Sequence, residues 1–182
     1  ALPWMQEAVN SYPDHSLQQS MAWRQLGSIH RLLGHTQQAT SCFNEAINIL
    51  FDVPPHDRLQ ERIGDVYLQL ALTNADLGEH QKAQFNLSFA YDNIKESNAG
   101  GEQLLISCLF AQASNGLELM DTIAARQKIE EVAKLHSSFQ FPEDHFELAL
   151  MQGRYDLVIN QPKRAMGQFE AALERIQYRS GQ

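Results

Sequence analysis

The side-chain types that most often bind transition metals occur nine times in this sequence, as seven histidines and two cysteines. Two histidines share a metal ion on a helix when they are four residues apart, and zinc sites combine closely spaced cysteines and histidines. No two histidines here are four apart, and neither Cys42 nor Cys108 lies beside a histidine. The sequence therefore predicts no metal site.

Two pairs of acidic residues have a spacing that general acid–base catalysis could use. Asp57 and Glu61 are four residues apart, as are Glu143 and Glu147. Such pairs on helices usually form solvated faces, and no nucleophile–base arrangement accompanies them. The glycines at 100–101 open a helix but lack the remaining residues of a phosphate-binding loop. We therefore expect no catalytic residue and no cofactor, and a protein that is not an enzyme.

Composition excludes several classes of partner. The chain has 182 residues, 43% of them hydrophobic, and a formal net charge of −8. This charge disfavours binding to nucleic acid, which needs a basic face, and to an anionic membrane surface, and the apolar runs are too short to span a bilayer. Two unpaired cysteines on apolar helical faces fit a reducing compartment, which indicates a cytoplasmic protein. The start at Ala1 suggests a fragment of a longer chain.

Apolar residues recur at helical spacing, and glycines, prolines and asparagines interrupt them about every twenty residues. This pattern predicts an all-α chain of antiparallel helix pairs, with Ser16 capping the first long helix and Thr36 beginning its return helix. The turn inside each pair is expected at Gly34, Gly78, Met120 and Asn160. We expect one domain over 1–182, with a leading helix at 2–12 and helix pairs at 16–51, 57–97, 101–138 and 142–178.

The second helices of the four pairs share a pattern of small, large and small residues. The first small residue falls at Ala39, Ala83, Ala125 and Ala165, in steps of 44, 42 and 40 residues. Small residues let paired helices approach closely, and the large residue fills the space that remains. The four sets are Ala39, Phe43, Ala46; Ala83, Leu87, Ala90; Ala125, Ile129, Val132; and Ala165, Phe169, Ala172.

The first pair carries a more specific signature. Trp23, Leu26 and Gly27 stand in the order of the motif W-x2-L-G-x2-Y, His30 replaces its tyrosine in an aromatic packing position, and A-x3-F follows at Ala39. The chain thus resembles the tetratricopeptide-repeat family in its long-repeat form, which is similar to units of cell-polarity adaptors, kinesin light chains and bacterial signalling regulators. The resemblance implies a right-handed superhelical solenoid whose concave groove binds proteins or peptides.

Counting the family's groove positions from Trp23 gives the residues that would bind a partner, with arginines selecting acidic groups on it. The subfamily that binds acidic chaperone tails uses an asparagine where Ser28 stands, which argues against that function. The expected groove residues are Arg24, Ser28, Arg31, Asp65, Leu68, Leu72, Phe110, Ser114, Glu147, Leu150 and Arg154.

Two other functions stay open at the level of sequence. The chain could be the regulatory or sensory segment of a bacterial multidomain signalling protein, where it would bind an effector or a neighbouring domain. It could also be a self-association scaffold, because a solenoid with an unprotected end exposes an apolar flank. Trp4 lies near such an end, so a homodimer would form through the N-terminal flank.

Overall fold

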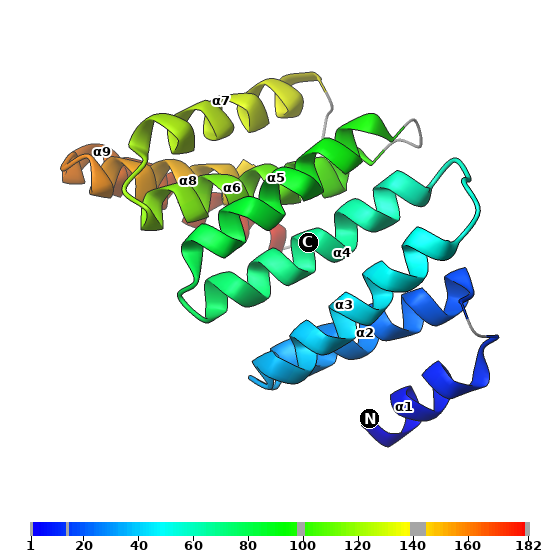
Figure 1. The fold of residues 1–182 in the computed structure, drawn as a ribbon. Coiled ribbons are helices and arrows are strands. Elements are labelled where there is room, and N and C mark those ends of the chain that lie inside the picture. The colour runs from blue at the N-terminus through cyan, green and yellow to red at the C-terminus, as the bar shows by residue number, and fades with distance from the viewer. Residues whose placement is uncertain (1, 14, 98–100, 139–144, 181–182) are drawn as a thin grey trace. The chain divides into compact units, whose positions relative to one another are not determined.

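The computed structural model describes residues 2–13, 15–97, 101–138 and 145–180. In these ranges it contains nine α-helices and no strand, as the sequence predicts for an all-α chain (Figure 1). The proline at position 142, expected near a helix start, lies outside the described residues. The helices are α1 (Leu2–Ser11), α2 (Leu17–Leu32), α3 (Thr36–Asp52), α4 (Leu59–Asp76), α5 (His80–Glu96), α6 (Glu102–Glu118), α7 (Thr122–Ser138), α8 (His145–Val158) and α9 (Pro162–Ser180).

Helix starts follow the predicted local chemistry. The Ser16 hydroxyl accepts a hydrogen bond from the backbone N–H of Gln19 at 3.1 Å, which satisfies one of the free donors of α2. Helix α3 begins at Thr36, and α9 begins at Pro162, where the missing N–H costs nothing.

The four turns inside the helix pairs share one geometry. Gly34, Gly78, Met120 and Asn160 have φ of 76°, 74°, 59° and 59°, in the left-handed region. The residue after each of them donates its N–H to a carbonyl five positions back, over 2.7 to 2.9 Å. This hydrogen bond closes the end of each first helix and turns the chain into the second helix. The sequence therefore predicted the turn residues correctly in all four pairs.

The chain forms two compact units, Ala1–Cys108 and Leu109–Gln182, whose boundary falls inside α6. In the first unit, α2 packs against α3 and α4 packs against α5, while α3 contacts α4 and α1 contacts α2 (Figure 1). In the second unit, α8 packs against α9 and also contacts α7. The expectation of a single domain stays a prediction.

The repeated small and large residues lie at the helix–helix contacts. Each of the small residues predicted on the second helices is buried, Val132 among them, and so are Phe43, Leu87 and Ile129. Phe169 is half-buried and differs in this respect from its three equivalents. A Cβ atom at Gly27 would lie 2.6 Å from the Phe43 ring, so the small residue is required where α2 crosses α3.

Trp23 joins two hydrophobic clusters of the first unit. It packs against the cluster of Val9, Ala22, Leu26 and Cys42, and also against the cluster that includes Phe43 and Leu50. Its half-buried side chain therefore belongs to the core, as expected for the tryptophan of the repeat signature.

Candidate interaction surface

The first helices of adjacent pairs contact each other directly in the first unit, where α2 meets α4. Arg24 of α2 binds Asp65 of α4 through two atoms. Its Nη2 donates a hydrogen bond to Oδ1 at 3.0 Å, and its Nε lies 2.9 Å from Oδ2. Only the Nη2 contact is a hydrogen bond, because Arg24 Nε has no hydrogen-bond partner among the described residues, and both side chains are partly shielded from solvent. Two of the expected groove residues are therefore brought together.

The other expected groove arginines are engaged in the same manner. Arg31 Nε of α2 lies 2.7 Å from Asp76 Oδ2 of α4. In the second unit, Arg154 of α8 donates to the hydroxyl of Ser114 at 2.9 Å and to Glu118 Oε1 at 3.1 Å on α6.

These ion pairs change the expected role of the arginines. Each one ties the first helix of a pair to the first helix of the neighbouring pair, over 36 to 45 residues of sequence. Their charges are balanced inside the protein. These three arginines were expected to select acidic groups on a ligand, but each is already paired with an acidic side chain of the protein.

The remaining expected positions divide into accessible and inaccessible ones. Glu147 and Leu150 are exposed on α8, Leu72 is half-buried on α4, and the Ser28 hydroxyl donates to the Arg24 carbonyl at 3.1 Å.

Leu68 and Phe110, which were expected to line a groove, are buried, with only 2% and 9% of their surfaces exposed. Helix α4 packs against α2, α3 and α5, so little of its circumference is left for a partner. Helix α6 likewise buries residues around most of its circumference, Phe110 included.

Two adjoining cavities lie along the contact between α2 and α4. The first has a volume of about 130 Å³ and the second about 290 Å³. They share Arg24, Arg62 and Asp65, so they form one depression with an apolar end and a charged end. The apolar end is lined by Met21, Leu50 and Val66 beside Ser20 and Gln25, and the charged end by Arg58 and Glu61 beside Leu104.

Arg62 lines both cavities and is not among the expected groove residues. Its Nε is buried and has no hydrogen-bond partner among the described residues. Arg62 precedes Asp65 by three positions and therefore shares its helix face. Extending the expected groove stripe by one turn toward the start of α4 would have included it.

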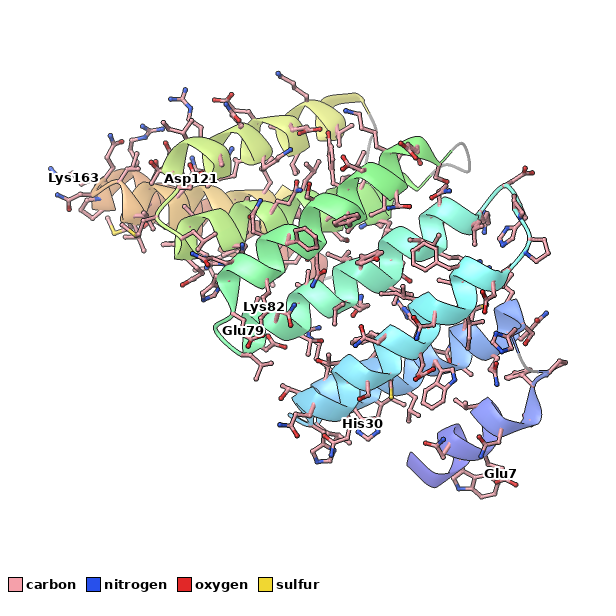
Figure 2. All side chains as sticks on the ribbon, in the orientation of Figure 1. Glu7, His30, Glu79, Lys82, Asp121 and Lys163 are labelled. Carbon is pink, nitrogen blue, oxygen red and sulfur yellow. The ribbon has the colours of Figure 1, made fainter. Side chains whose placement is uncertain are left out.

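Two histidines approach each other at the turn between α2 and α3. The Nδ1 atoms of His30 and His35 are 3.4 Å apart, a separation at which one ring can donate to the other (His30 is labelled in Figure 2). Burial and, secondarily, the charge of His35 lower the pKa of His30. Within the described ranges no three histidine, cysteine or acidic side chains gather in a way that could hold a metal ion.

Both cysteines are buried free thiols, and burial raises the pKa of Cys42. A protonated, enclosed thiol is a poor nucleophile, so Cys42 serves packing. Trp4 lies at the opposite extreme, with 77% of its surface exposed on α1.

Comparisons with known proteins identify the fold but no family. No family model matches this sequence. No curated protein matches it either. The structure is similar to the crystal structure of BtubC (BKLC) from P. vanneervenii, with a TM-score of 0.79 and 14% identity over 99% of this chain and 73% of that chain. Among the described residues, no helix is long and apolar enough to cross a membrane. The chain has an all-α, helical-repeat fold.

Proposed function

We propose that this chain is a non-enzymatic interaction module of the tetratricopeptide-repeat type, which binds an extended peptide or protein segment along the face formed by α2 and α4. One observation carries the proposal. The contact between α2 and α4 opens into two adjoining cavities, one with Met21 and other apolar side chains in its lining and one lined mainly by charged side chains. Extended peptides are commonly recognised by such a combination, because pockets for alternate side chains give specificity.

The apolar end has the size of a single anchoring side chain. A cavity of roughly 150 Å³ holds a benzene ring, and the cavity beside Met21 has about 130 Å³. Met21 is 39% exposed, so it is available to a ligand. A leucine, methionine or similar side chain of a partner would cover it and remove apolar surface from water.

The two buried thiols, which form no disulfide, support a protein that works in a reducing, cytoplasmic setting. The tetratricopeptide-repeat assignment is supported by the four left-handed turn residues and by the close contact between Gly27 and Phe43.

The test is a selection of random twelve-residue peptides on the purified chain, followed by affinity measurements with two matched variants. Met21→Glu places a charge at the apolar end and should reduce affinity at least tenfold. Phe85→Glu changes an equally apolar residue, 64% exposed on α5, and should leave affinity unchanged. The opposite result would place the binding face on α5, and a selection without any binder would refute the proposal.

A second candidate function is self-association through the N-terminal flank, which the exposure of Trp4 favours. A large exposed aromatic side chain near the end of a repeat array is a common element of protein contacts. Light scattering over a concentration series should then show a dimer that Trp4→Glu abolishes. A monomer at every concentration would exclude this function.

A further inference from the structure

We infer that Arg62 is a binding residue for a carboxylate of the peptide partner, so that the preferred ligand carries an aspartate or glutamate next to its apolar anchor. This inference rests on the proposed peptide-binding function. It deepens that function by naming the ligand's chemistry.

The arginines that line the depression outnumber its acidic residues by one. Three guanidinium groups, of Arg24, Arg58 and Arg62, face two carboxylates, of Glu61 and Asp65. Asp65 is bound by Arg24 through two atoms. Glu61 is the nearest acid to Arg58, at 3.9 Å. Arg62 is then the one arginine of these three that forms no ion pair with an acidic side chain of the described residues.

The placement of Arg62 suits an anionic ligand rather than solvent. Its Nε is buried without a hydrogen-bond partner in the described part of the chain, as are Arg24 Nε and Glu61 Oε2 of the same depression, although buried polar atoms in folded proteins nearly always have one. The planar guanidinium group matches a carboxylate through two parallel hydrogen bonds. A ligand carboxylate would supply the missing acceptor and the missing negative charge together.

The start of α4 adds to this preference. Arg62 lies in the first turn of the helix, whose cap residue Arg58 makes no side-chain hydrogen bond to the free backbone donors. Helix N-termini carry a partial positive charge that favours anions within about one turn. The helix end and the arginine therefore act in the same direction at the charged end of the depression.

The two cavities also define the spacing between the ligand's groups. Arg62 lines both of them, and Met21 lines only the first. A ligand whose apolar side chain lies beside Met21 would thus hold its acidic group close by, on an adjacent residue or the next but one. Arg24 and Asp65, between the two, compensate each other and leave the recognition of charge to Arg62.

The test compares peptide selections on the full chain, on Arg62→Gln and on Arg164→Gln, an exposed arginine on α9 that serves as the control. Pools from the full chain and the control should be enriched in Asp or Glu beside an apolar residue, and the Arg62→Gln pool should not. For one selected peptide, changing its acidic residue to the amide should weaken binding to the full chain about tenfold, as expected for a charge-assisted hydrogen bond. The same change should have no effect on Arg62→Gln.

Three results would overturn the inference. Peptides that bind without acidic enrichment, with affinity unchanged by Arg62→Gln, would refute it and leave peptide binding intact. An enrichment in Asp or Glu that persists in the Arg62→Gln pool would show that another residue binds the carboxylate. A failure of all three proteins to select any peptide would refute the peptide-binding function itself. Circular dichroism of each variant shows whether it is folded.

Discussion

Gly27 and Phe43 are matched to each other across the α2–α3 contact, because a Cβ atom on Gly27 would lie 2.6 Å from Phe43 Cε1. Gly153 has the same relation to Phe169 in the second unit, at 2.5 Å. In the two middle pairs, where the smaller Leu87 and Ile129 replace phenylalanine, the residues that align with Gly27 are Ala71 and Ala113. The size of the small residue thus follows the size of the large one.

This relationship predicts that Gly27→Ala destabilises the protein by about 1 to 3 kcal/mol, as overpacking of a core usually does. Combining it with Phe43→Leu, which imitates the second pair, should cost less than the sum of the two single changes, because each relieves the defect that the other creates. Urea unfolding of the four proteins measures this coupling. Gly167→Ala is the control, since no atom lies within 4 Å of its Cβ position and alanine favours the helix. Strict additivity would contradict the matched packing.

The sequence predicted the helices and turns closely because their causes are local. The four turn residues within the helix pairs are those expected, since a left-handed residue after a helix is decided by a few neighbouring side chains. Burial of the small and large residues followed from their regular spacing, with half-buried Phe169 as the exception.

The surface was predicted less well, because its properties depend on helices that are distant in sequence. Arg24 meets Asp65 only because α2 and α4 are stacked side by side, and spacing within one helix does not reveal the partner. Leu68 has the position of a groove residue and is nevertheless buried, since α4 is enclosed by three helices. Arg62 was missed because the burial of its Nε without a hydrogen-bond partner among the described residues shows only in the three-dimensional arrangement.

The ion pair between Arg24 and Asp65 predicts that Arg24→Glu lowers the free energy of unfolding by about 1 kcal/mol, since it replaces attraction by repulsion between partly shielded groups. Adding Asp65→Arg should recover part of the loss, and 1 M salt should shrink the difference. Lys82→Glu is the control. Lys82 pairs with Glu79 at the start of α5, so this ion pair joins no two helices, and it is more exposed than the pair of Arg24 and Asp65 (Figure 2). Equal losses for Arg24→Glu and Lys82→Glu in urea unfolding would contradict a stacking role for Arg24.

The left-handed turns predict changes of opposite sign at equivalent positions. Met120→Gly should stabilise the protein by about 1 kcal/mol, because glycine adopts a φ of 59° without the steric cost that a side chain brings. Gly34→Ala should destabilise it by a similar amount. No atom lies within 4 Å of the Cβ position at Gly34, so the loss would come from the backbone alone. Thermal unfolding of both variants measures the shifts, and a destabilised Met120→Gly would show that the methionine side chain makes a compensating contact.

The contact between His30 and His35 predicts that stability depends on pH below neutrality. Burial, and then the charge of His35, lower the pKa of His30 below its usual 6.5. Between these two pKa values the unfolded chain binds more protons than the folded one, so the free energy of unfolding falls as the pH is lowered through this window. Above 6.5 both states are neutral at this site, and the contribution is constant. NMR titration of the ring protons gives the pKa directly, and urea unfolding at several pH values gives the slope.

The variant His35→Asn separates the two causes of the lowered pKa. It removes the neighbouring charge but leaves His30 partly enclosed, so the pKa of His30 should rise without reaching 6.5. The dependence of the unfolding free energy on pH should flatten by the corresponding amount. A His30 pKa at or above 6.5 in the unmodified protein would contradict both the contact and the sign of the effect, because an open ring at a helix C-terminus is stabilised in its charged form.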